Sequence, residues 1–396
     1  MKGRRPLLGG FTPEELFSMS DDRNRVRRLL AEGQSIWLDF ISRELIGSGR
    51  LGRFIDEDGL RGLTSNPSIF EKALSSGHEY DDEIVALARQ DLDADHIFDR
   101  LAIADVKAAC REFSRLYTET GGADGFVSIE VSPRLAKETA ETLTEAHRLA
   151  AAVACPNVMV KIPATKEGIP AIRRALADGL NINITLIFSL ADYEAVAEAY
   201  LQALEERVAS DKPIDGIHSV ASFFISRIDR LVDTWLETKA RESGPRAEQI
   251  LGLRGKLGVA NSRLAYERFV EILGSNRWKA LEEKGATVQR LLWASTSTKN
   301  PSYDDLLYVN NLIGRHTVNT LPESTYEAFK DHGTIARTVD KDVAGAHAHM
   351  KALIAAGVNA DAATAKLQVD GVDLFVKSFD KVVGIVEQRR AALVAP

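Results

Sequence analysis

Short apolar runs rich in β-branched residues alternate along this chain with longer segments in which apolar residues recur every three or four positions. The first pattern is typical of buried strands and the second of amphipathic helices. The predicted strands occupy residues 35–40, 60–65, 126–131, 157–162, 182–188, 217–222, 290–295 and 316–320. Helical patterns lie between several of them, at residues 134–153, 168–179, 190–209 and 225–242. Strand followed by helix, repeated, predicts a parallel sheet with right-handed crossovers.

Eight strands in this order favour an α/β fold, a (β/α)8 TIM barrel, over an open doubly wound sheet. No glycine-rich dinucleotide-binding motif, a common feature of open doubly wound sheets, follows the first strand. Residues 66–125 and 223–289 are too long for simple barrel connections, so we predict helical insertions at about 70–120 and 235–285. A helical C-terminal extension is predicted at about 323–396. No linker divides the chain, so residues 1–396 are predicted to form one barrel domain.

Composition narrows the possible partners and the compartment. The chain has 396 residues and a net charge of −7, which gives no reason to expect a nucleic-acid partner. Its two cysteines, Cys110 and Cys155, argue against a disulfide framework and for a reducing compartment. The basic start, residues 1–10, lacks the apolar stretch of a signal peptide, and no run is long enough to span a membrane. We therefore expect a cytoplasmic protein; the sequence does not decide between a monomer and a homo-oligomer.

Polar side chains stand at or just beyond the ends of most predicted strands. They are Asp39, Asn66, Glu130, Lys161, Asn183, Thr185, Ser222 and Ser295. In a barrel, the carboxyl ends of the strands meet at one mouth, where catalytic residues lie. Any one of these residues could simply be a strand end that meets water. Two carboxylates, a lysine and several amides and hydroxyls together favour a site.

The lysine gives this set a specific chemistry. Burial disfavours the charged ammonium form, so a strand-end lysine among apolar neighbours can offer a neutral amine. Such an amine attacks a ketone and forms a Schiff base, which acts as an electron sink for breaking the adjacent carbon–carbon bond. The proton transfers of this chemistry need carboxylic groups. Asp39 and Glu130 are the candidates, with Lys161 as the nucleophile. Lys166, in the following turn, is expected to be exposed.

Six segments, in order, resemble the sequence blocks of the longer form of transaldolases. They are LTSNPSIFEKAL (63–74), VSIEVSPRLA (127–136), VMVKIPATKEGIPAI (158–172), NITLIFS (183–189), VASFFISRIDRLVD (220–233) and LLWASTSTKNPSYDD (291–305). The resemblance extends from about residue 33 to residue 333. Each block alone is moderately specific, whereas six in the correct order are highly specific.

The resemblance implies a class I aldol transfer of the non-oxidative pentose phosphate pathway that uses no metal and no cofactor. Lys161 would carry a dihydroxyacetone unit from sedoheptulose 7-phosphate or fructose 6-phosphate to glyceraldehyde 3-phosphate or erythrose 4-phosphate. Asp39 matches the acid/base of carbon–carbon cleavage. Glu130 matches a glutamate that acts through a water also held by a threonine, here Thr185. Three further positions, Asn66, Asn183 and Ser222, match residues that contact the substrate.

Phosphate binding is where this chain departs from the short form of the family. Arg227 matches the phosphate-binding arginine. The short form has a second arginine two residues after the strand-seven serine, but here Ser297 holds that position and Lys299 lies two residues beyond. We expect Lys299 to supply the charge and Ser295 a hydrogen bond, because lysine also binds phosphate as a point charge. The alternative is that Lys299 lies in a solvated turn and has no role in phosphate binding.

Two other functions and one other site are compatible with parts of the sequence. A fructose 6-phosphate aldolase would use a similar site but release the three-carbon unit to water, and a catalytically silent barrel would only bind sugar phosphates. The relatives with aldolase activity are shorter, and the lysine and both carboxylates are present, so transaldolase is favoured. Residues 91–99 partly match a calcium loop, yet His96 stands where its turn requires glycine. An acidic helix start is the favoured interpretation there.

Overall fold

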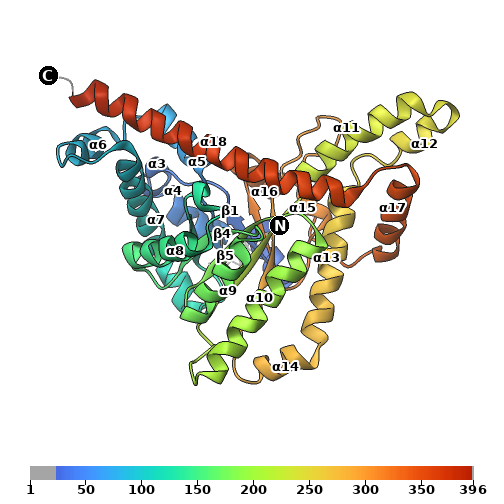
Figure 1. Cartoon of the computed structure of the whole chain (residues 1–396), viewed down its shortest axis with the longest axis horizontal. Coiled ribbons are helices and arrows are strands. Elements are labelled where there is room, and N and C mark those ends of the chain that lie inside the picture. The colour runs from blue at the N-terminus through green and yellow to red at the C-terminus, as the bar shows by residue number, and fades with distance from the viewer. Residues whose placement is uncertain (1–23, 395–396) are drawn as a thin grey trace, which may run out of the picture.

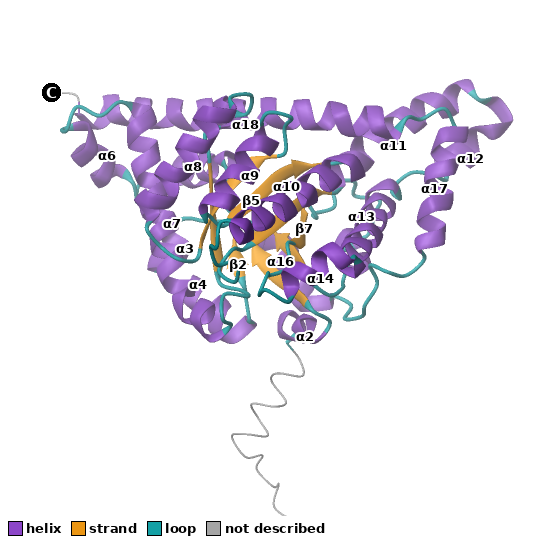
Figure 2. Ribbon diagram, turned by 60° about the horizontal axis from the view of Figure 1, so that its bottom comes forward, coloured by secondary structure: helices purple, strands orange, loops and turns teal. Residues whose placement is uncertain are grey.

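The computed structural model describes residues 24–394, and the basic N-terminal segment, for which no signal peptide is predicted, lies outside this range. Eight parallel strands form a closed barrel in chain order, each paired with its sequence neighbours and β8 with β1. Figure 2 shows these strands at the centre of the molecule, surrounded by helices. The strands are β1 (Gln34–Leu38), β2 (Gly62–Leu63), β3 (Phe126–Glu130), β4 (Val158–Pro163), β5 (Ile182–Ile187), β6 (Ser219–Phe224), β7 (Arg290–Ala294) and β8 (Thr317–Leu321). The predicted TIM barrel is confirmed.

Helices fill every connection of the barrel. Those outside the two long connections are α2 (Arg25–Ala31), α3 (Arg43–Gly47), α4 (Arg50–Arg53), the π-helix η1 (Phe54–Asp58), the 3-10 helix η2 (Pro133–Leu135), α8 (Thr139–Val153), α9 (Gly168–Asp178), α10 (Leu190–Ala209), α15 (Leu307–Asn311), α16 (Glu323–His332), α17 (Val343–Ala355) and α18 (Ala360–Val394). The long connections contain α5 (Pro67–Ser76), α6 (Asp81–Ala88), α7 (Ala94–Glu119), α11 (Ser226–Glu242), the 3-10 helix η3 (Gly244–Arg246), α12 (Ala247–Leu251), α13 (Leu257–Gly274) and α14 (Asn276–Glu282). The division of the chain into domains stays a prediction.

Two strands and one loop refine the sequence analysis. Strand β6 begins and ends two residues later than predicted, because Phe223 and Phe224 still pair with β7. Regular pairing of β2 covers two residues only, fewer than predicted. The segment that partly resembles a calcium loop is the start of α7, where the Asp93 side chain accepts a hydrogen bond from the His96 backbone N–H at 2.9 Å. None of the helices within residues 24–394 combines the length and hydrophobicity that crossing a bilayer requires.

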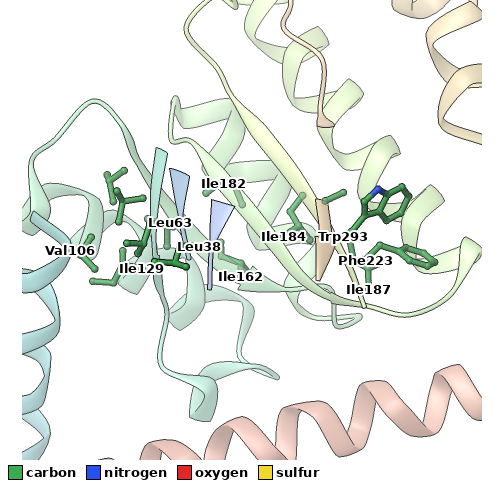
Figure 3. Close-up of a cluster of buried hydrophobic side chains, with 14 of the residues drawn as sticks. Leu38, Leu63, Val106, Ile129, Ile162, Ile182, Ile184, Ile187, Phe223 and Trp293 are labelled. Atoms are coloured by element: carbon green, nitrogen blue, oxygen red, sulfur yellow. The ribbon is translucent and has the colours of Figure 1, made fainter. Parts of the chain in front are cut away.

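Alternate residues of the strands pack in two separate buried clusters. One set, Trp37, Phe126, Met159, Val220, Leu292 and Val318, forms part of a cluster in the barrel interior. The intervening residues, such as Leu38 and Ile162, pack outward against helices that include α7 (Figure 3). Gly62 makes room for the interior layer, since a Cβ there would lie 2.5 Å from the Trp37 ring. Asp39, Lys161 and Ser222 each come two residues after a member of this layer. Their side chains therefore also point into the barrel, nearer to the carboxyl ends of the strands.

The C-terminal extension ends in one long helix, α18, which crosses the barrel. Figure 1 shows it running from the side of α17 to the side of α6, and Figure 2 places it at the end of the barrel opposite α2. Side chains of α18 bond to the barrel and its helices: Gln368 Nε2 donates to the Ala164 carbonyl at 2.9 Å, and Arg389 pairs with Asp81 at 2.8 Å. The helix therefore covers the mouth formed by the carboxyl ends of the strands.

Candidate active site

A pocket of about 590 Å³ lies at the mouth of the barrel, between the strand ends and α18. Its walls come from strand ends, α5, α11 and α18. The polar residues that line it include Asp39, Thr64, Asn66, Lys72, Lys161, Thr185, Ser222, Ser226, Arg227, Arg230, Ser295, Ser297, Lys299 and Asp370. Predicted site residues from six strands thus converge here, as they should if the barrel brings strand ends together.

The amine of Lys161 stands at the centre of this site. Its side chain projects from β4 and is only 6% exposed. Nζ donates a hydrogen bond to the Ser65 carbonyl at 3.1 Å and lies 3.5 Å from Glu130 Oε2. The ring of Phe375, on α18, lies 5.9 Å from Nζ and covers it on another side. Lys166, by contrast, is exposed, as predicted.

The turn after β4 is held by local contacts. Thr165 Oγ1 donates to the Ala136 carbonyl at 2.6 Å and accepts from the Gly168 N–H at 2.9 Å. A Cβ at Gly168 would lie 2.1 Å from the Pro163 carbonyl oxygen, so α9 can begin this close to the strand only with glycine. The sequence motif that follows Lys161 therefore fixes the end of β4 from which the lysine projects.

Both predicted carboxylic groups lie where burial favours their protonated forms. Loss of solvation raises the pKa of Asp39, opposed by the hydrogen bond from Thr64 Oγ1, at 2.7 Å, and by the charge of Lys161. Burial likewise raises the pKa of Glu130, which the positive charge of Lys161 opposes. A carboxylic group whose pKa moves toward neutrality is better suited to both giving and taking a proton.

Neutral polar groups lie on the strands beside β4 and at the start of α5. Asn183 Nδ2 donates to Ser128 Oγ at 2.9 Å, and Ser222 Oγ donates to Asn183 Oδ1 at 2.7 Å. Asn66 caps α5, with its Oδ1 accepting from the Ile69 N–H at 3.1 Å. Thr185 Oγ1 is buried and has no hydrogen-bond partner among the described residues. These groups can orient hydroxyls of a ligand that reaches Lys161.

Cationic side chains gather at the outer part of the pocket. Arg227, in the first turn of α11, has no carboxylate within ion-pair distance among residues 24–394, and burial lowers its pKa against the opposing charges of Asp39 and Glu130. Lys299 is exposed, and its Nζ donates to Ser297 Oγ at 2.6 Å. Loss of solvation in the pocket and then the charges of Lys72 and Arg227 lower the Lys299 pKa. In a protein of net charge −7, this local excess of cations favours an anionic ligand.

Comparisons with known proteins agree with this geometry. A family model described as "Transaldolase/Fructose-6-phosphate aldolase" matches residues 36–386. The chain belongs to this family. A protein named Transaldolase from Trichodesmium erythraeum (strain IMS101) is 43% identical over 361 residues, covering 90% of this chain and 95% of the relative. The Transaldolase of Thermobifida fusca (strain YX) is 43% identical over 368 residues, covering 93% and 98% respectively. The Transaldolase of Mycobacterium ulcerans (strain Agy99) is 42% identical over 377 residues, covering 95% and 100%. The resemblance noted from the sequence blocks is thereby confirmed.

Within this family assignment, the structure places all ten predicted site residues in or against one pocket. Eight line it directly, while Glu130 lies beside Lys161 and Asn183 lies beneath Ser222. Their individual roles stay predictions. Lys72 and Arg230 also line the pocket but were not predicted. Arg230 has a detectable signal, because it follows Arg227 by three residues on α11 and so lies on the same helix face. Lys72, on α5, has no such spacing to a predicted residue.

Two backbone features near the site had no sequence signal. The register of β5 against β6 shifts between Ile184 and Ile187, where Leu186 adopts a positive φ of 59°. This bulge brings Leu186 into the interior cluster below α18, where a Cβ on Gly371 would lie 3.0 Å from it. Ser295 also has a positive φ, 56°, and its Oγ lies 2.9 Å from Ser226 Oγ. Such strained residues are typical of functional sites.

A buried aspartate anchors the helix that carries Arg227, and its titration should be visible in the stability of the fold. Asp229 accepts hydrogen bonds from the Gly258 N–H at 2.8 Å and from the Tyr308 hydroxyl at 2.9 Å. Loss of solvation raises its pKa from 3.8 to about 7. Between these values the folded protein holds a proton that the unfolded chain has lost, so the contribution to stability is full below about pH 4 and is lost as pH rises through 7.

The expected result is that Asp229→Asn loses less stability between pH 5 and pH 8 than the parent, by a few kcal/mol. Asparagine keeps the acceptor for Gly258, and the Tyr308 hydroxyl can reverse its role and accept. Urea unfolding at both pH values measures the difference. Equal losses in the two proteins would show that Asp229 is ionised in the fold throughout this range.

Proposed function

We propose that this protein is a transaldolase that carries a dihydroxyacetone unit on Lys161 between sugar phosphates. The observation that supports it most directly is the buried amine of Lys161, 3.5 Å from Glu130 and in the same pocket as Asp39 and Arg227. The relatives named Transaldolase, 42–43% identical over nearly the whole chain, support a transferase. A cytoplasmic location stays a prediction.

The reaction would proceed in four steps. Lys161 first gives its ammonium proton to Glu130, and its amine then adds to the C2 carbonyl of a ketose phosphate. The resulting carbinolamine loses its hydroxyl as water when Glu130 supplies a proton. Asp39 then takes the proton of the C4 hydroxyl while the C3–C4 bond breaks, and its electron pair passes into the imine to give an enamine. An aldose phosphate leaves. A second aldose phosphate accepts the enamine carbon, Asp39 returns the proton, and water releases the new ketose.

Two buried oxygens support the proposed role of water in these steps. Glu130 Oε2 and Thr185 Oγ1 both lack a hydrogen-bond partner among the described residues. A buried polar atom without a hydrogen bond is costly, and a bound water is its usual partner. A water held between them would stand beside Lys161, where the carbinolamine hydroxyl must leave and return.

Trapping the intermediate tests the proposal. Fructose 6-phosphate and borohydride are added to the protein, and the product is analysed by intact mass and peptide mapping. One reduced three-carbon unit on Lys161 is the expected result. No adduct, or an adduct on Lys166, would contradict the mechanism. Cleavage is then assayed with and without erythrose 4-phosphate, because full turnover without an acceptor would identify a lyase of the fructose 6-phosphate aldolase type instead.

The two proposed phosphate-binding cations should contribute unequally to the KM for fructose 6-phosphate. Arg227→Ala is expected to raise KM for fructose 6-phosphate by about 100-fold with a smaller fall in kcat, because a half-buried guanidinium that holds phosphate bidentately is lost. Lys299→Ala should raise KM only about threefold to tenfold, since its exposed ammonium is better screened. Steady-state kinetics of both variants, with Lys284→Ala as an exposed lysine outside the pocket for control, decide the matter. An unchanged KM for Lys299→Ala would show that Lys299 lies in a solvated turn and does not bind phosphate.

A further inference from the structure

A second cavity, of about 320 Å³, lies beside the substrate pocket on the side of β3. Its walls come from α5, α7, α8, the segment after β3, and Phe379 of α18. Asn66 lines both cavities, whereas Lys161 lines only the substrate pocket and Glu130 only the second cavity. Glu130 therefore stands between them, with Oε2 3.5 Å from Lys161 Nζ. The predicted proton donor has access to a space that the substrate pocket does not include.

The second cavity is polar at both ends and apolar between them. Its inner end carries Ser65, Asn66, Glu130 and Ser132, and its middle is lined by side chains such as Phe98 and Leu149. Its outer end carries Asp95, His96, Asp99, Glu145 and Arg148. At about 30 Å³ per molecule, the volume holds on the order of ten waters. Polar ends and an apolar middle suit a passage for water better than a site for a large polar ligand.

Charge separates the two cavities as well. Three carboxylates and one arginine line the outer end of the second cavity, where Arg148 pairs with Asp99 at 2.6 Å and with Glu145 at 2.7 Å. The substrate pocket instead has five cationic residues against two aspartates, Asp39 and Asp370. A sugar phosphate dianion is drawn to the substrate pocket and not to the second cavity. Water, which is uncharged, is not excluded by either.

We infer that the second cavity is a water conduit to Glu130, separate from the entrance for sugar phosphates. The inference rests on the proposed function. Each loading of Lys161 releases one water, formed from the carbinolamine hydroxyl and a proton given by Glu130, and each unloading consumes one and returns that proton. When a sugar phosphate fills the pocket under α18, this water needs another route. Glu130 Oε2, buried and without a hydrogen-bond partner among the described residues, lies where that route meets the amine.

The inference predicts which steps depend on the conduit. Formation of the imine from free enzyme and fructose 6-phosphate releases water, and release of product consumes it. Addition of erythrose 4-phosphate to the loaded enzyme, which converts a three-carbon adduct into a seven-carbon adduct, exchanges no water. Quenching each reaction with borohydride at timed intervals and measuring intact mass gives both rates in one protein. Their ratio is independent of the fraction of enzyme that is folded.

A reversible plug at the outer end is the first test. His96, whose side chain is 70% exposed at this end, is replaced by cysteine in a Cys155→Ala background, with Cys110 buried. A bulky methanethiosulfonate reagent then forms a mixed disulfide that dithiothreitol removes. We expect the label to slow imine formation about tenfold, to leave the three-to-seven-carbon conversion within about twofold, and to be reversed by dithiothreitol. His78→Cys, exposed and outside both cavities, is labelled identically as the matched control.

A second variant fills the conduit from within. Ala102 of α7 lines the cavity, so Ala102→Leu narrows it at a distance from Lys161. The same selective loss is expected. If neither the plug nor the filled variant changes the ratio of the two rates, or if both steps slow together, the conduit is wrong although the imine forms. If the parent protein forms no trapped adduct at all, it is the proposed function that fails.

Discussion

Lys161→Ala should form no trapped adduct with fructose 6-phosphate and should lose about 10⁶-fold in kcat, the scale seen when the nucleophile of a covalent enzyme is removed. The reason is that no other amine within residues 24–394 stands in the right place. Lys72 and Lys299 lie in the same pocket but on α5 and after β7, whereas Lys161 Nζ is the amine next to Glu130. Intact mass after borohydride, together with steady-state kinetics, measures both effects.

Lys166→Ala is the matched control for this change. Lys166 lies five residues further on and is exposed, so its loss should alter neither the adduct nor kcat beyond about twofold. Thermal unfolding of both variants separates lost chemistry from a lost fold, because Lys161→Ala also removes the donor to the Ser65 carbonyl. Substantial activity in a folded Lys161→Ala protein would mean that catalysis is not covalent, and the catalytically silent or non-covalent alternatives would have to be reconsidered.

The sequence was sufficient to predict those parts of the site that follow from strand periodicity. In a closed barrel each strand delivers its terminal side chains to one mouth, so Asp39, Lys161 and Ser222 could be grouped without any knowledge of contacts. Lysine among apolar neighbours then indicated the chemistry. The residues themselves narrowed the function to a lysine-based barrel enzyme, and the six sequence blocks, as a resemblance, supplied the specific transfer.

The parts that could not be predicted depend on long-range packing. Phe375 lies more than 200 positions from Lys161 in sequence, and only the path of α18 over the mouth places its ring beside the amine. The extension could be predicted as helical, but a helical pattern does not reveal which surface the helix will cover. The bulge at Leu186 could not be predicted either, since a strand pattern of residues 182–188 continues through it. It lies against Gly371 of α18, a residue far away in the sequence.

Asp39→Asn should affect fewer steps of the reaction than Lys161→Ala does. The imine should still form and be trapped, because Glu130 and Lys161 are intact, whereas carbon–carbon cleavage should slow by about 10²–10⁴-fold, the usual contribution of a positioned acid/base. Asparagine retains an oxygen that can accept the 2.7 Å hydrogen bond from Thr64, so the geometry is preserved while the proton acceptor is lost. Single-turnover release of the aldose phosphate, compared with the yield of trapped adduct, measures the two effects separately.

The pH dependence gives a second and independent measure of the same residue. Burial raises the pKa of Asp39, and cleavage requires its ionised form, so the cleavage rate should fall as pH drops through a value above the ordinary aspartate range. In Asp39→Asn this acid limb should vanish from the residual rate. Asp370→Asn makes the same chemical change in the same pocket, on α18 and away from Thr64, and should keep both the limb and the parent rate within about threefold. A fully active Asp39→Asn protein would show that Asp39 is not the acid/base of carbon–carbon cleavage. Of the two predicted carboxylic groups, Glu130 would then have to perform both proton transfers.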